Sequence, residues 1–224
     1  MKVLIACESS GISREAWRKL GHDAWSCDLL PADDESPYHF QCDVMEVINK
    51  GWDLMIAHPS CTYLTNSAAW AYGDGPYHQK VKPETLVGAA RRQAREEALN
   101  FVRMLMAAPI SKIAIENPVG AIGTRIKPAS QYIHPYEYGE DASKRTGLWL
   151  KGLPKLVRTA YCKPRIVEWP PGLGMRVERW GNQTDSGQNK LTPGADRWKA
   201  RSKTYQGWAD AMAEQWGDQE KGAN

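Results

Sequence analysis

The chain has 224 residues, a formal net charge of +3 and 42% hydrophobic residues. This length suits one α/β domain with a modest insertion, and such a domain buries a core without disulfide bonds. No apolar run approaches the roughly 18 residues of a membrane span, and the N-terminus does not resemble a secretory signal. The five cysteines form no Cys-x-x-Cys pair and no Cys/His cluster at zinc spacing. We therefore expect a cytoplasmic protein with free thiols, no metal and no membrane contact.

The charges are unevenly distributed along the chain. Residues 142–204 contain fourteen Lys or Arg and four Asp or Glu (+10), whereas the remainder contains fifteen basic and twenty-two acidic residues (−7). Four tryptophans, at positions 149, 169, 180 and 198, alternate with these basic residues. Basic residues interleaved with flat aromatic rings are typical of a nucleic-acid surface. The alternative is an exposed basic segment whose tryptophans form a small satellite core.

The first fifty residues predict a cofactor pocket. A buried parallel strand is expected at residues 2–7, where apolar residues follow one another without alternation. A turn, a helix from about residue 13 to 21 and a second strand at 24–27 follow. The turn contains Glu8, Ser9 and Gly11, and the second strand ends at Asp28. In this order of elements the turn and the helix N-terminus face a nucleotide-type ligand, and the acid binds its ribose hydroxyls.

The composition of that turn favours a cofactor without phosphates, such as S-adenosylmethionine. Pyrophosphate sites need several glycines for close backbone approach, and this turn has only Gly11. Glu8 would also repel a phosphate. Further along, Asp43 precedes a short helix predicted at residues 45–49, where it either contacts the cofactor or caps the helix.

Two further strands end in reactive side chains. The apolar run at residues 53–57 leads into His58-Pro59-Ser60-Cys61, and the strand at 111–115 leads into Glu116-Asn117. Ligands of open α/β sheets bind at the carboxyl ends of the strands, so the Cys61 thiol and the Glu116 carboxyl group are expected in one crevice. Taken alone, Cys61 is equally typical of an inert buried thiol, and Glu116 of a residue paired with a lysine.

The remaining segments complete the expected architecture. Residues 66–82 are a loop rich in Gly, Pro, Tyr and His. Residues 83–107 form an amphipathic helix with a structural role, with Leu86 in its apolar stripe and Arg91 on the polar side. A basic turn with Lys144 and Arg145 enters a strand, and Gly207 opens a final helix. We expect residues 1–152 and 203–217 to form the main domain, and 153–202 a small basic insertion of hairpins and loops.

In this order, the motifs resemble those of the DNA cytosine-C5 methyltransferases, in a small, divergent, phage-like form. The shared motifs are the Gly-containing turn, Asp28, Asp43, the Pro-Cys loop at Cys61, Glu116-Asn117, the basic strand and the final helix at Gly207. The chain departs from the family in having Pro59-Ser60-Cys61 in place of Pro-Pro-Cys, and in lacking the Arg-x-Arg spacing near Arg145. The resemblance implies a Rossmann-like methyltransferase fold, with the insertion as the DNA-recognition region.

The resemblance also implies roles for individual residues. Cys61 would attack C6 of a cytosine flipped out of double-stranded DNA, Glu116 would be kept partly protonated to bind N3 and the exocyclic amine, and Arg145 would hold the nucleotide. S-adenosylmethionine, the implied cofactor, would bind seven residues: Glu8, Ser9, Gly11, Asp28, Asp43, Pro59 and Gly207. Trp70, Tyr72 and Tyr77 would lie on a mobile loop that closes on DNA, or else they are surface aromatics of an ordered loop.

Two other functions stay open from the sequence. An amino methyltransferase acting on adenine N6 or cytosine N4 uses a loop at the same strand end, but it needs no thiol. A methyltransferase-like protein that binds DNA without catalysis would explain the departures from the family motifs, since a fold does not settle a function. A third possibility keeps the cytosine-C5 chemistry but has RNA as the substrate in place of DNA.

Overall fold

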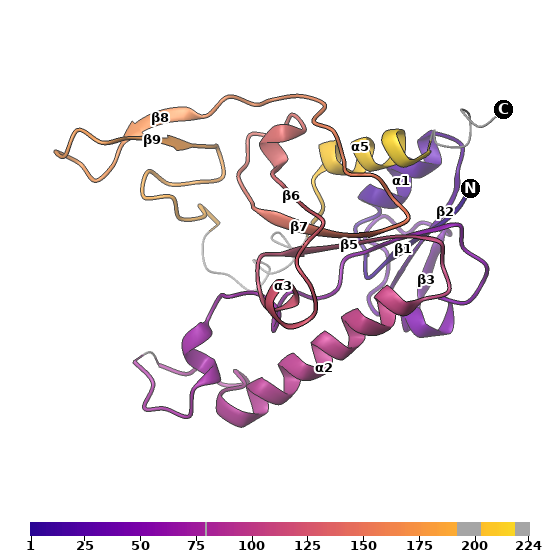
Figure 1. The fold of residues 1–224 in the computed structure, drawn as a ribbon, viewed down its shortest axis with the longest axis horizontal. Helices are drawn as coiled ribbons and strands as arrows, with labels where there is room; N and C mark the ends of the chain where they lie inside the picture. Colours follow the sequence, from indigo (N-terminus) through magenta and orange to yellow (C-terminus); the bar gives the residue numbers. More distant parts are fainter. Residues whose placement is uncertain (79, 192–202, 218–224) are drawn as a thin grey trace.

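A mixed seven-stranded sheet forms the centre of the protein (Figure 1). The computed structural model describes residues 1–78, 80–191 and 203–217. In chain order, the strands of this sheet are β1 (Lys2–Ala6), β2 (Asp23–Asp28), β3 (His39–Gln41), β4 (Leu54–Ala57), β5 (Lys112–Pro118), β6 (Gln131–Ile133) and β7 (Thr146–Lys151). Their spatial order is β3-β2-β1-β4-β5-β7-β6. The first five are parallel, and β7 is antiparallel to both β5 and β6. The predicted α/β class with a mainly parallel sheet is therefore confirmed.

Helices cover both faces of the sheet (Figure 1). Within the described ranges the α-helices are α1 (Ile12–Lys19), α2 (Gly88–Ala107), α3 (Ala121–Arg125) and α5 (Gln206–Gly217). Val3 and Ile5 of β1 pack with α1 and α5 on one face, while Leu4 packs with α2 on the other. The continuous apolar run of β1 is explained by this two-sided burial, because successive side chains point to opposite faces. None of the helices in these ranges has the length and apolar character needed to cross a membrane.

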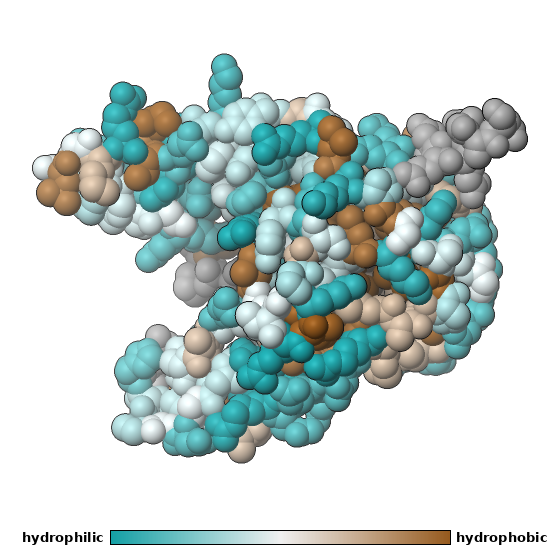
Figure 2. Space-filling model, viewed as in Figure 1, coloured by the Kyte–Doolittle hydropathy of each residue, from teal (hydrophilic) through white to brown (hydrophobic). Residues whose placement is uncertain are grey.

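Three short 3₁₀ helices and a separate hairpin complete the described structure. The 3₁₀ helices are η1 (Val44–Glu46), η2 (Ala69–Tyr72) and η3 (Pro135–Glu137), and the hairpin pairs β8 (Arg165–Glu168) with β9 (Arg176–Arg179). Figure 1 shows the hairpin above the sheet and the η2 segment below it, as two arms that both extend to the left, and Figure 2 shows an open notch between them. Strands β3 and β6 were not predicted, since three-residue strands are too short to show a periodic pattern.

The base of the hairpin arm is fixed to the loop that precedes β7. The Trp180 ring stacks on Tyr136 with the centroids 4.1 Å apart, and its indole nitrogen donates to the Cys162 carbonyl at 3.0 Å. The Asn182 side chain accepts from the Ser143 backbone N–H at 2.9 Å and donates to the Ser143 carbonyl at 3.0 Å. These contacts tie the basic insertion to the residues just before Lys144.

Helix α2 differs from its prediction at both its start and its buried face. It begins at Gly88 instead of residue 83, and Leu86, expected in the apolar stripe, is exposed. Arg91, expected on the polar side, is buried. The reason is tertiary, because the α2 arginines hold the segment after Cys61. Arg95 donates to the Tyr63 carbonyl at 3.0 Å and stacks over the Tyr72 ring.

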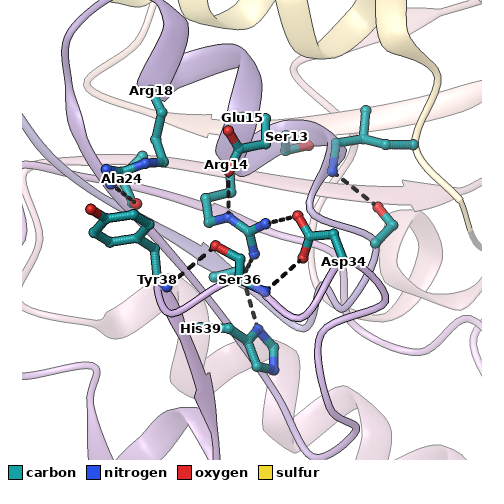
Figure 3. A network of polar contacts seen from close by, with 12 residues as sticks. Ser13, Arg14, Glu15, Arg18, Ala24, Asp34, Ser36, Tyr38 and His39 are labelled. Atoms are coloured by element: carbon teal, nitrogen blue, oxygen red, sulfur yellow. Dashed lines mark hydrogen bonds and ion pairs between the residues drawn. The ribbon is translucent and has the colours of Figure 1, made fainter.

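The segment between β2 and β3 is fastened by one buried arginine (Figure 3). Arg14 of α1 is fully buried, and its guanidinium donates to the Ser26 hydroxyl at 2.7 Å and to the Asp34 carboxylate. It also pairs with Glu15 at 2.9 Å. His39 continues the network through a 2.9 Å contact between its Nε2 and the Leu30 carbonyl. With its charge compensated in this way, Arg14 has a structural role.

This network predicts that Asp34→Asn lowers stability. The substitution removes one of the two charges that compensate the buried Arg14 guanidinium, so we expect a loss of about 1–2 kcal/mol, reduced from the value for a fully buried pair by the exposure of Asp34. Urea unfolding measures the change. Glu35→Gln, which removes the same charge from the exposed neighbouring residue, is the control. Equal stability of the two variants would contradict the structural role of Arg14.

Candidate functional site

The candidate site lies at the carboxyl ends of β1 and β4, the neighbours between which the strand order reverses. The chain leaves β1 for β2 on one side and later returns to β4 on the other, and such switch points open a crevice for ligands. The two strand ends are joined by a 2.9 Å hydrogen bond from the His58 backbone N–H to the Ala6 carbonyl. Cys7, the first residue beyond β1, has a left-handed backbone (φ 59°) that few non-glycine residues adopt.

The turn after β1 presents a buried carboxylate. Glu8 is 5% exposed, and its Oε1 accepts from the Ser10 hydroxyl and from the Ser13 backbone N–H at 3.4 Å. Its Oε2 is buried and contacts no donor among the described residues. Gly11 has a φ of 75°, and a Cβ there would lie 2.5 Å from the Arg14 guanidinium. Ser9 uses its carbonyl to accept from the Asp33 backbone N–H at 2.8 Å.

Asp28 and Asp43 come together near Cys7. Burial, followed by the charges of Asp28 and Asp43, raises the pKa of the Cys7 thiol to about 12, so both carboxylates lie close to it. Asp28 also accepts from the Leu30 backbone N–H at 2.9 Å. Asp43 accepts from the Met45 backbone N–H at 2.9 Å and forms a capping box with Glu46 at η1. The helix cap, one of the two interpretations of Asp43, is therefore present.

The loop that carries Cys61 is clasped to the loop that follows Glu116. The Asn117 side-chain nitrogen donates to the Pro59 carbonyl at 2.7 Å, and the Ala121 backbone N–H donates to the Leu64 carbonyl at 2.6 Å. A Cβ at Gly120 would lie 1.9 Å from the Leu64 carbonyl oxygen, so only glycine permits this approach. Pro59 is buried and Cys61 is a half-buried free thiol. The clasp fixes the thiol loop against the end of β5.

Glu116 is surrounded by three groups from three different elements. Its Oε2 lies 2.9 Å from His58 Nδ1, and the two side chains are 10% and 8% exposed. Burial raises the pKa of Glu116. The Lys144 charge and the His58 hydrogen bond together lower it by more than burial raises it, so the pKa of Glu116 lies below the ordinary 4.5. Tyr205, which precedes α5, has its pKa raised by burial, then by Glu140 and by Glu116. This direction is opposite to the one that a partly protonated Glu116 requires, because Lys144 and His58 favour the carboxylate.

Arg145, expected to hold the nucleotide, and Gly207, expected to bind the cofactor, both make contacts within the scaffold. Arg145 is exposed, and its guanidinium packs over the Tyr132 ring at 4.2 Å, whereas the neighbouring Lys144 acts on Glu116. Gly207 is required by packing, since a Cβ there would lie 2.0 Å from the Tyr138 carbonyl oxygen. Its backbone N–H donates to Glu140 at 3.2 Å.

The aromatic residues after Cys61 are packed against one another. The Trp70 ring contacts Tyr77 edge to face with centroids 5.7 Å apart, and the Tyr72 hydroxyl donates to the Tyr63 carbonyl at 2.9 Å. Arg92 donates to the Tyr72 carbonyl at 2.7 Å. These contacts give the segment an ordered scaffold of its own on α2.

Sequence reasoning missed the roles of His58 and Tyr205 beside Glu116. The available signal for His58 was its place at a strand end, directly before Pro59 in the thiol loop. Tyr205 had no signal, because it reaches Glu116 only through the return of the chain end to the sheet. Among the described residues no group of His, Cys, Asp and Glu is arranged to hold a metal ion. No protein-family model matches the chain, and no curated protein matches it in sequence.

The charge around Glu116 predicts different effects for two adjacent basic residues. A carboxyl group with a lowered folded-state pKa adds stability above its unfolded pKa, and this stability is lost as the pH falls through the folded value. Lys144→Met should raise the pKa of Glu116, so stability is lost at a higher pH than in the unmodified protein. Urea unfolding from neutral pH to about pH 3 measures this shift. The control is Arg145→Met, which removes an equal positive charge at a position that does not act on Glu116. Superimposable curves for the two variants would contradict the assignment.

Proposed function

We propose that the protein is an S-adenosylmethionine-dependent DNA methyltransferase that methylates cytosine at C5 through a covalent bond to Cys61. The observation that carries the proposal is the clasp between the Cys61 loop and the Glu116 loop. It fixes the loop that carries Cys61 against the end of β5, the strand that carries Glu116, and β4 and β5 are adjacent and parallel. Open α/β sheets bind ligands at the switch point, and we assign the methyl donor to the switch point between β1 and β4.

The residues after β1, β2 and β3 suit a cofactor that is cationic and lacks phosphates. Glu8 has a buried Oε2 that contacts no donor among the described residues, and such an oxygen favours an ammonium group or another N–H donor. Asp28 and Asp43 add two carboxylates around Cys7, which disfavour an anion and accept hydrogen bonds from ribose hydroxyls or an amine. S-adenosylmethionine has all of these groups, and when bound it supplies an electrophilic methyl group.

Cys61 is the proposed nucleophile. Its thiolate adds to C6 of the cytosine, and the ring electrons then make C5 nucleophilic toward the methyl group. Loss of the C5 proton to a base and departure of the thiolate restore the aromatic ring. We assign to Lys144 the role first expected of Arg145, since the Lys144 charge acts on Glu116.

Glu116 acts in this scheme mainly as a hydrogen-bond acceptor. Lys144 and His58 favour the ionised form of Glu116, so Glu116 itself does not carry the proton that N3 requires. That proton is taken up from solvent when the nucleotide binds, and the free oxygen of the carboxylate then accepts from the N3–H and the exocyclic amine of the attacked ring. Neutralisation by Lys144 reduces the repulsion between the carboxylate and the electron-rich ring.

The notch between the two arms is the proposed path of DNA (Figure 2). The β8–β9 hairpin contributes exposed basic residues, among them Lys163 and Arg176. The second arm contributes the aromatic segment that α2 holds. A base in a duplex is inaccessible to Cys61 until it is flipped out, and basic and aromatic arms on either side of the site suit a duplex opened in this way.

DNA that carries 5-fluorocytosine at the target tests the covalent step. The adduct should persist after methyl transfer, because fluorine replaces the proton that must leave C5. We expect a covalent protein–DNA product that depends on S-adenosylmethionine and maps to Cys61 by mass spectrometry of peptides. Cys61→Ala should give neither the trapped species nor 5-methylcytosine.

The same experiment separates the other functions. An amino methyltransferase would retain activity in Cys61→Ala and yield an N-methylated base without an adduct. A protein that binds DNA without catalysis would give no product while retaining affinity for the duplex. A clear methylated product from Cys61→Ala would refute the proposed mechanism. Cys162→Ala, which removes a cysteine at the base of the hairpin arm, is the matched control.

The hairpin arm predicts salt-dependent DNA binding. The double substitution Lys163→Glu and Arg176→Glu should weaken binding to duplex DNA and lower the slope of log affinity against log salt by about one for each lost phosphate contact. Fluorescence anisotropy over a salt series measures both quantities. Lys19→Glu with Arg103→Glu gives the same change of net charge on α1 and α2. Equal losses in the two double variants would show that only net charge matters.

A further inference from the structure

His58 has no role in the motifs that the chain shares with the methyltransferases. It stands where β4 ends, in the sequence His58-Pro59-Ser60-Cys61, and its backbone N–H is held by the Ala6 carbonyl at 2.9 Å. In the parallel register of β4 and β5, Ala57 pairs with Ile115, so the next residues are His58 and Glu116. The two side chains therefore start from adjacent positions on neighbouring strands.

The contact between these side chains is short and buried. His58 Nδ1 and Glu116 Oε2 are 2.9 Å apart, and the side chains are 8% and 10% exposed. The remaining polar atoms of the pair, His58 Nε2 and Glu116 Oε1, are buried and make no hydrogen bond within the described residues. Buried polar atoms usually have a partner, so two adjacent exceptions indicate atoms that serve a bound ligand.

We propose that His58 is the positioning residue of Glu116: its Nδ1–H donates to Oε2, which leaves Oε1 as the single oxygen available to a bound base. A carboxylate with one oxygen already bonded has a fixed plane, and its second oxygen has a fixed direction. The same hydrogen bond makes His58 Nε2 an acceptor when the imidazole is neutral. The part of this inference that concerns the base rests on the proposed function.

The charges around the pair favour this arrangement. Lys144, from the loop before β7, supplies a positive charge toward Glu116, and Tyr205, before α5, supplies a phenol. The contact with Oε2 needs a proton on Nδ1, because a carboxylate oxygen can only accept a hydrogen bond. The loop clasp at Asn117 and Pro59 holds both backbones, and the side-chain contact is therefore not left to a mobile segment.

Nuclear magnetic resonance of the unmodified protein tests the hydrogen bond without cofactor or DNA. At neutral pH, ¹⁵N signals of the imidazoles, assigned through His58→Asn, should show the His58 proton on Nδ1. Titration of ¹³C-labelled glutamate, assigned through Glu116→Gln, should give a midpoint below the ordinary glutamate range. A proton on Nε2 with a bare Nδ1 would overturn the proposal, whether or not any variant folds.

Two His58 variants separate positioning from simple packing. Asn offers a side-chain N–H near the place of Nδ1, whereas Leu fills the space without a donor. His58→Leu should raise the titration midpoint of Glu116, and His58→Asn should keep it close to that of the unmodified protein. Ser60→Ala, in the same loop but exposed, is the control and should change nothing. An unchanged midpoint in folded His58→Leu would overturn the proposal.

Activity gives an independent second measurement. If the protein methylates DNA, kcat should fall by about 10- to 100-fold in His58→Leu, with the acidic limb of the pH profile displaced, and should largely recover in His58→Asn. Equal kcat in the two variants would refute positioning. If neither the unmodified protein nor the variants yield methylated DNA, the proposed function fails. The titration of Glu116 alone then decides the role of His58.

Discussion

The arrangement of the site depends on one buried hydrogen bond, from the Asn117 side chain to the Pro59 carbonyl. Proline cannot donate a backbone hydrogen bond, and its buried carbonyl would be costly to leave without a partner. Asn117 satisfies that carbonyl from the neighbouring strand end, and Gly120 lets the following chain approach Leu64 closely. Cys61 and Glu116, 55 positions apart in the sequence, are thereby held in one local structure.

Charge is separated over the molecule in a way that suits two different ligands. Asp28 and Asp43, from the ends of β2 and β3, lie close enough to act on Cys7, and two carboxylates favour a cationic ligand. The hairpin arm has exposed basic residues such as Arg176 and faces the notch (Figure 2). Lys144 stands near Glu116, where these two regions meet. Under the proposed function, a cationic cofactor and an anionic polymer would approach the same centre from different sides.

Several arginines that would suit a nucleic-acid surface instead stabilise the scaffold. Arg14 is fully buried and joins α1 to β2 and to the segment around Asp34 (Figure 3). Arg95 binds a loop carbonyl and stacks on Tyr72. The planar guanidinium suits both tasks, since it donates in several directions and packs on aromatic rings. A count of basic residues therefore overstates the charge that is available to DNA.

The sequence by itself determined the α/β class, the order of the main strands and the strand ends that carry Glu8, Asp28, Cys61 and Glu116. These features follow from local patterns, since buried parallel strands are continuous apolar runs and polar residues mark their ends. Tertiary structure alone decided which polar residues meet. His58 and Lys144 reach Glu116 from separate elements, Arg145 turns to Tyr132, and Tyr205 returns from the end of the chain. The reason is that strand register, side-chain direction and burial set these contacts, and none of them has a periodic signature in the sequence.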